Sequence, residues 1–198
     1  MTSVNPIIEQ KREQLRQQRR LQTAIHEAGH VLGARLHGSK VKSATIVATK
    51  DYQGIVYSTT IKWEENVIEY LLGYAAEIQF GYVERRRWFQ GHGEDYARAE
   101  KAIKEHLRYK KSEAWSEQTG IKGWRGTVPC HRHDFQLGVH YKMWRKAVRI
   151  AKGEWTPIFN RLRRKARRLA EKHAVYIKKV ADLLTEKDTL TDEEIPHL

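Results

Sequence analysis

Three residues early in the sequence have the types and spacing of a metal-dependent hydrolase. His26 and His30 are four residues apart, which on a helix places both imidazoles on one face, one turn from each other. This spacing lets two ring nitrogens reach one zinc ion at the ~2.0–2.1 Å that zinc–nitrogen bonds require. Glu27 follows His26 directly, where it can serve as general base for a water whose pKa the metal lowers. The pattern His-Glu-x-x-His on a helix therefore predicts a zinc peptidase.

A catalytic zinc site needs a third protein ligand and one open position. His37 comes one residue too late to complete the longer pattern His-x-x-x-His-x-x-Gly-x-x-His, because Leu36 stands at the required place. We therefore expect His37 on the surface, near the C-terminal end of the helix. The other candidates come later in the chain, and composition alone does not choose between them: Glu77, His92, Glu94, Asp95 and His106. Asp95 has the best placement, because it follows a glycine loop at the start of a predicted helix.

The elements that must position these residues are mainly helical. Both histidines lie on a predicted helix from about residue 7 to residue 37, polar at first and then amphipathic. Residues 41–61 are rich in Val, Ile, Thr and Tyr around a turn at 51–54, which predicts two strands in a hairpin. We expect further helices over about 67–80, 95–107, 135–152 and 155–184, a loop or lid over 115–133, and a short last helix after a capping box at 191–194. The expected fold class is mainly α with a small β-hairpin or sheet.

Composition limits the setting and the partners. The chain has 37 Lys and Arg against 24 Asp and Glu, a net charge of +13, which attracts nucleic acid or acidic proteins. The sharpest basic segment is a predicted helix over 161–179, so nucleic acid and acidic partners are possible ligands there. Cys130 is the single cysteine, which excludes an internal disulfide and favours a reducing, cytoplasmic setting. No apolar run is long enough for a membrane span, and the N-terminus is unlike a secretory signal.

Several segments resemble the peptidase domain of the FtsH-type, membrane-anchored AAA proteases. They are the zinc motif at 26–30, a strand pair at 45–47 and 54–57, a Gly-x-Ala-Ala-Glu-type helix at 73–81, a glycine loop with its following segment at 91–99, and the tail at 180–195. The resemblance runs from about Thr23 to Ile195. By position it implies His26, His30 and Asp95 as zinc ligands and Glu27 as general base. It also implies that Glu77 lies beside the site and supports it.

The resemblance implies a zincin-type helical metallopeptidase domain over residues 23–198, preceded by a basic, polar helical extension over 1–22. The sequence lacks the phosphate loop of an ATPase and a membrane anchor. We therefore expect an ATP-independent zinc endopeptidase that cleaves flexible or unfolded protein segments, with any ATPase acting as a separate partner. The hairpin would offer an edge strand to an extended substrate. The alternative is a nucleic-acid- or protein-binding regulator built on a peptidase-like scaffold.

Overall fold

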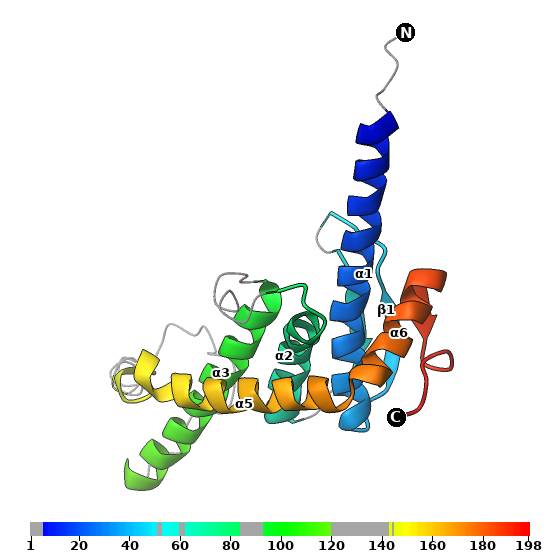
Figure 1. Ribbon diagram of the computed structural model, residues 1–198. Helices are drawn as coiled ribbons and strands as arrows, with labels where there is room; N and C mark the ends of the chain where they lie inside the picture. Colours follow the sequence, from blue (N-terminus) through cyan, green and yellow to red (C-terminus); the bar gives the residue numbers. More distant parts are fainter. Residues whose placement is uncertain (1–5, 51–52, 60–61, 84–92, 120–142, 144) are drawn as a thin grey trace.

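The structure is a computed structural model that describes residues 6–50, 53–59, 62–83, 93–119, 143 and 145–198. Its helices are α1 (Pro6–Leu36), α2 (Trp63–Gln79), α3 (Glu94–Thr119), α5 (Lys152–Lys172) and α6 (Ala174–Lys187), and its strands are β1 (Val41–Thr45), β2 (Ile55–Ser58) and β3 (Thr189–Thr191) (Figure 1). The expectation of a mainly helical fold with a small sheet is confirmed. Within the described ranges, no helix is long and apolar enough to cross a membrane.

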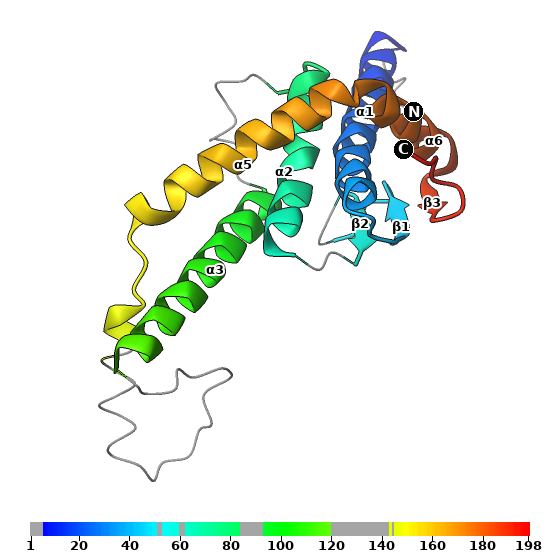
Figure 2. The same ribbon diagram turned by 90° about the horizontal axis from the view of Figure 1, so that it is seen from below.

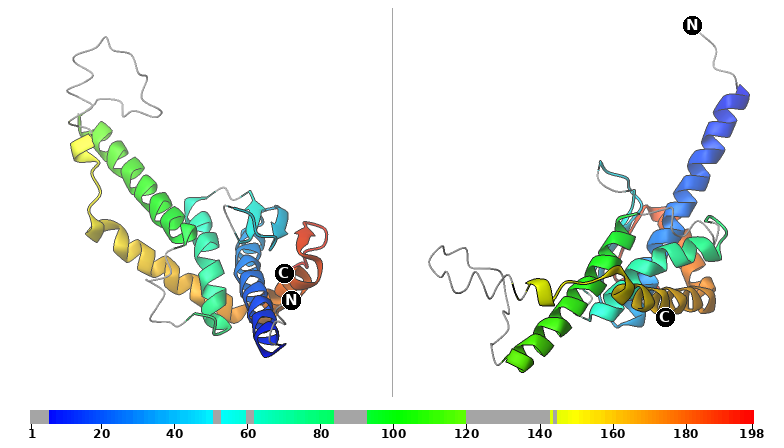
Figure 3. Two further views of the ribbon diagram at one scale, coloured as in Figure 1. Left: turned by 90° about the horizontal axis from the view of Figure 1, so that it is seen from above. Right: turned by 90° about the vertical axis from the view of Figure 1, so that its left-hand side faces the viewer.

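Helix α1 has two halves with different surroundings. Residues 6–20 are exposed, and this half projects beyond the rest of the molecule (Figures 1 and 3). A continuous run from Ala24 to Ala34 is packed inside, with only His26 partly accessible. Contacts of α1 with α6 begin at Arg20, before the expected domain start at residue 23. The Arg20 guanidinium donates to the Thr185 carbonyl of α6 at 2.8 Å and pairs with Asp188. The two histidines therefore sit on the supported half of the helix.

Glycines let α1 and α2 approach each other closely. A Cβ added at Gly29 would lie 2.4 Å from the Leu72 carbonyl oxygen, and one at Gly33 would lie 2.9 Å from the Cα of Glu69. Both positions therefore require glycine for this packing. Large apolar side chains close the interface on either side, among them Ile25, Leu32, Ile68 and Leu71. The backbone of α2 is thus brought against the face of α1 that carries the histidines.

The sheet has the order β2-β1-β3 and all its pairings are antiparallel. The predicted hairpin is confirmed, with Thr45 opposite Ile55. The third strand was not expected: Leu190 of β3 pairs with Ala44 of β1. No helix follows β3. The Glu194 carboxylate does accept the Thr191 N–H at 2.9 Å, as a capping box requires, but the backbone then makes only a turn. Strand β2 lies at one edge of the sheet.

The helix predicted over about 155–184 is in fact two helices. The chain bends at His173, so α5 lies across α2 while α6 lies beside α1 (Figure 2). The predicted break near Gly153 lies a few residues earlier than expected: residues 149–151 are not helical, α5 begins at Lys152, and Gly153 belongs to its first turn. Helix α3 continues to Thr119, so the first residues of the predicted loop over 115–133 are helical. The rest of that loop and most of the predicted helix over 135–152 lie outside the described residues.

Candidate metal centre

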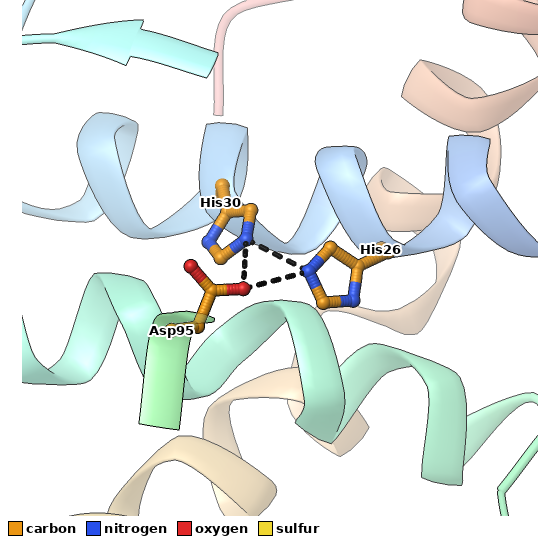
Figure 4. A group of neighbouring side chains, drawn as sticks. All are labelled: His26, His30 and Asp95. Atoms are coloured by element: carbon orange, nitrogen blue, oxygen red, sulfur yellow. Dashed lines mark hydrogen bonds and ion pairs between the residues drawn. The ribbon is translucent and has the colours of Figure 1, made fainter. Parts of the chain in front are cut away.

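His26, His30 and Asp95 converge from two helices. Both histidines come from α1, and Asp95 lies in the first turn of α3. Their side chains point toward one another (Figure 4). The two Nε2 atoms are 3.0 Å apart, and the Asp95 Oδ2 atom is 3.0 Å from the Nε2 of His26 and 3.3 Å from that of His30. Three potential metal ligands predicted from the sequence are therefore brought within one small volume.

The far nitrogen of each imidazole is already engaged. His30 donates from Nδ1 to the backbone carbonyl of Glu69 at 2.8 Å. Because a carbonyl only accepts, the proton of the neutral His30 ring is on Nδ1 and its Nε2 lone pair faces the cluster. His26 is oriented likewise, with Nδ1 2.5 Å from the Glu77 carboxylate. Gln22 donates to the other oxygen of Glu77 at 2.8 Å. Such outer partners are typical of histidines that bind metals.

The donor set and the space around it fit a zinc ion. Donor atoms of a tetrahedral zinc site with bonds of ~2.0–2.1 Å lie about 3.3 Å apart, close to the separations found among these three residues. Gly73 of α2 borders the cluster, and a Cβ there would lie 2.7 Å from the Nε2 atoms of both histidines. Only a glycine leaves this side free. Two imidazoles and one carboxylate with room beside them are a three-ligand set suited to catalytic zinc.

The electrostatics of the cluster favour a positive charge at its centre. Burial alone would lower the pKa of His26, but hydrogen bonds to Asp95 and Glu77 outweigh burial and raise its pKa to about 10. The pKa of His30 is also raised, because the Asp95 charge and hydrogen bond overcome its burial. In turn, burial raises the pKa of Asp95 less than the two histidines lower it, so its carboxyl stays ionised. A metal cation would take the place of these protons and release them.

Glu27 is buried beside the cluster, with an exposed fraction of 4 %. Burial raises the pKa of its carboxyl, and the charges of His30 and His26 partly oppose that rise. Among the described residues, no donor forms a hydrogen bond to this carboxylate. Gly54 lies against it: a Cβ there would be 2.6 Å from the Glu27 Oε1 atom. The base predicted from the sequence is thus held close to the ligands with its oxygens available.

The cluster opens into a cleft of about 670 Å³. One wall consists of Gly54, Ile55 and Val56, which lead into and begin the edge strand β2. The opposite side carries Tyr70 and Tyr74 of α2. The Tyr74 hydroxyl accepts the Gly93 N–H at 3.2 Å and so ties α2 to the start of α3, next to Asp95. The cleft is therefore lined both by the start of the edge strand β2 and by the ligand-bearing helices.

The other candidates for the third ligand lie elsewhere. Glu77 supports His26 instead of joining the cluster, and Glu94 lines the cleft but pairs with Arg98. His106 stacks on Trp63 with ring centroids 4.0 Å apart. His37 is half-buried, not on the surface as expected, and among the described residues its Nδ1 has no partner. His92 lies outside the described residues.

Sequence reasoning missed three contributors: Gln22, Gly73 and the Glu69 carbonyl. Gln22 precedes His26 by four residues and so shares its helix face, a signal that could have been used. The Glu69 carbonyl and the space at Gly73 depend on the register of α2 against α1, which no local pattern in the sequence reveals.

Comparison with known proteins gives no further assignment. No protein-family model matches the chain, and no curated protein matches it.

Proposed function

We propose that this chain is a zinc-dependent endopeptidase with an FtsH-like, zincin-type catalytic site. The observation that carries the proposal is the convergence of His26, His30 and Asp95 around a glycine-lined space, with the buried Glu27 next to it. The Nδ1 partners of His26 and His30 leave both Nε2 atoms directed at the same space, an arrangement typical of metal-binding histidines. The motif resemblance and the side-chain geometry thus support the same three ligands.

The residues of the site have three separate roles: metal binding, proton transfer and orientation of the imidazoles. His26, His30 and Asp95 hold the ion, which when bound lowers the pKa of a water and polarises a carbonyl. Glu27 takes the proton of the attacking water on its carboxylate and delivers it to the leaving amine. Burial raises the pKa of this carboxyl, the direction that favours uptake of a proton. Glu77 and the Glu69 carbonyl keep the imidazoles in the ligating orientation.

The substrate class follows from the cleft wall. Within the described sheet, β2 is an edge strand whose first residues line the cleft, and an extended peptide can pair with an edge strand through its backbone. This mode of binding needs a segment of several residues without secondary structure of its own. We therefore propose that flexible or unfolded protein segments are the substrates and that cleavage does not depend on ATP.

Casein, an unfolded reporter protein, tests this function. The wild-type protein is expected to contain about one zinc per chain and to cleave casein without ATP. Glu27→Gln should keep the zinc and lower the cleavage rate by about 10²–10⁴-fold, the usual contribution of a general base. Glu193→Gln is the matched control, because Glu193 is exposed and remote from the cleft, and it should cleave like the wild type. Full zinc occupancy with equal cleavage, or none, by wild type and Glu27→Gln would refute the proposal.

A further inference from the structure

The outer face of α5 carries a row of cations that the proposed peptidase does not use. Between residues 155 and 172 the helix has seven basic side chains and one acidic side chain, Glu171. Its buried face is apolar and consists of Trp155, Phe159, Leu162, Ala166 and Ala170. The cations are therefore confined to the other side. Arg161, Arg164 and Arg168 follow one another at spacings of three and four residues, which places them along one stripe.

Three of these cations have no acidic partner among the described residues. Arg161 pairs with Glu64 of α2 at 2.7 Å. Within the part of the chain that the structure describes, no carboxylate lies within ion-pair distance of Arg164, Arg167 or Arg168. The cations also act on one another: burial, Arg167 and Arg164 together lower the pKa of Arg163. The face thus presents a concentrated positive potential to solvent.

The three arginines 164, 167 and 168 line a groove of about 280 Å³ together with the single carboxylate of this stretch, Glu171, so cations outnumber the anion there by three to one. The other wall is the C-terminal part of α2, with Ala75, Ile78 and Gln79. These α2 residues are on a different face of the helix from Tyr70, Tyr74 and Glu77, which line the cleft. A ligand on the arginine face therefore leaves the proposed active site open.

We propose that this face binds the sugar–phosphate backbone of a double-stranded nucleic acid. Five of the seven cations are arginines, whose planar guanidinium matches a phosphate with two parallel hydrogen bonds. From Arg161 to Lys172 the row extends about 16 Å at 1.5 Å per helical residue. Each strand of a duplex presents one phosphate per ~3.4 Å of axis, so the row matches a short run of regularly repeated phosphates.

Other ligands fit the same face less well. Insertion into a membrane surface needs large apolar side chains on the exposed face, and α5 has none among its described exposed residues. A single strand needs aromatic platforms for its bases, but Trp155 and Phe159 are buried. The arginines of α5 are assigned here to phosphates, and phosphate contacts carry no base-sequence information. Binding is therefore expected to be independent of base sequence.

Fluorescence anisotropy with a labelled 24-base-pair duplex tests the proposal, using full-length protein that carries Glu27→Gln to prevent self-cleavage. Matched duplex DNA and duplex RNA, each at 50, 100 and 200 mM KCl, distinguish the two sources of phosphate backbone. Tight binding of either duplex, weakening steeply with salt, supports the proposal. The triple variant R164Q/R167Q/R168Q should bind at least tenfold more weakly at 50 mM and should lower the salt slope by about 2–3, at about 0.9 for each lost phosphate contact.

The control triple variant K11Q/R12Q/R16Q removes the same charge from the projecting half of α1, and it should change the affinity less than threefold. If the α5 triple variant is unfolded by circular dichroism, the double variant R164Q/R168Q, with two exposed positions, should show a smaller loss in the same direction. Equal losses in the α1 and α5 triple variants would overturn the proposal, as would absence of duplex binding. Tighter α5-dependent binding to polyglutamate or to phosphatidylserine vesicles would overturn it too.

Discussion

At the scale of single residues, the space at Gly73 is the feature on which the candidate metal centre depends most directly. A Cβ at this position would lie 2.7 Å from both Nε2 atoms, which leaves no room for a methyl group. Gly73→Ala must displace at least one imidazole at a cost of about 1–3 kcal/mol, so zinc affinity should fall about tenfold or more. Zinc per chain, measured after dialysis against a buffered zinc series, checks this result.

Gly153→Ala is the matched control for that substitution. It makes the same change in a helix where nothing lies within 4 Å of the added Cβ, and it should leave zinc binding unchanged. Alanine is a better helix former than glycine by about 1 kcal/mol, so Gly73→Ala should not weaken α2 itself. A loss of zinc in this variant would therefore come from the displaced imidazoles. Equal zinc affinity in both variants would contradict the role assigned to Gly73.

The Glu77 carboxylate has a different role, because it touches a proposed ligand and not the ion. Glu77→Ala removes the acceptor of the His26 Nδ1 proton and the partner of Gln22. Outer partners of this kind change metal affinity by about 10–100-fold, and we expect a loss of that size. Competition with a chromogenic zinc chelator measures it. Glu105→Ala, at an exposed position of α3, should retain wild-type affinity; a similar loss there would show that the assay reports stability instead.

The residues of the site differ in how far the sequence could predict them. His26, Glu27 and His30 form a local motif, and Asp95 follows a glycine loop, so each carries a signal within a few positions. Gly73 carries none, since its importance appears only when α2 is packed against the histidine face of α1. The expectation for His37 failed for a similar reason: the sequence places it on the surface near the C-terminal end of the helix, but tertiary packing half-buries it.

At the scale of elements, α1 and the hairpin were predictable because their apolar periods are regular and end at glycines or a turn. The break between α5 and α6 at His173 was not, because neither glycine nor proline marks it. By contrast, Gly153 marked the start of α5 to within a few residues, because the residues just before Lys152 are not helical. Strand β3 has three residues, too few to show a period, and its pairing partner lies far away in the sequence.

The turn after β3 makes a pH-dependent contribution to stability. The Lys187 ammonium and the Thr191 N–H lower the pKa of Glu194 from 4.5 to about 2. A carboxyl whose pKa is lower in the folded state stabilises the fold above its unfolded pKa. This stabilisation is therefore complete above about pH 4.5 and is lost as the pH falls toward 2. The difference in Tm between wild type and Glu194→Gln should shrink over this range, as scanning calorimetry at pH 6, 4 and 3 would show.

Glu193→Gln provides the comparison for that experiment, because the neighbouring Glu193 is also exposed. Its Tm should follow the wild type at each pH. A gap between wild type and Glu194→Gln that stays constant from pH 6 to pH 3 would argue against a stabilising role of the ionised Glu194.

At the scale of the whole molecule, the projecting half of α1 is separable from the folded body. Residues 6–20 are exposed, and Arg20 is the first of them to contact α6. A chain that begins at residue 18 should keep the wild-type zinc affinity, with its Tm lowered by less than about 2–4 °C, the shift that about 1 kcal/mol produces in a chain of this size.

A chain that begins at residue 24 loses Arg20 and Gln22, the latter being a partner of Glu77. It should show both a lower Tm and weaker zinc binding. Thermal unfolding and zinc titration of the two truncated proteins, side by side, check these expectations. Similar losses in both would mean that the projecting half of α1 is part of the folded unit.

The placement of β3 has a consequence for the time course of folding. Thr45 and Ile55 are near neighbours in the chain, but the contact between Thr45 and Thr189 joins residues 144 positions apart. Closing so long a loop is slow, and local structure forms first. A two-stranded hairpin alone is only marginally stable. We therefore expect β2, the strand that borders the cleft, to be stably formed only after β3 has paired with β1. We expect a newly made chain to form the proposed substrate-binding edge late, so that the proposed peptidase would not cleave neighbouring chains before its own folding is complete.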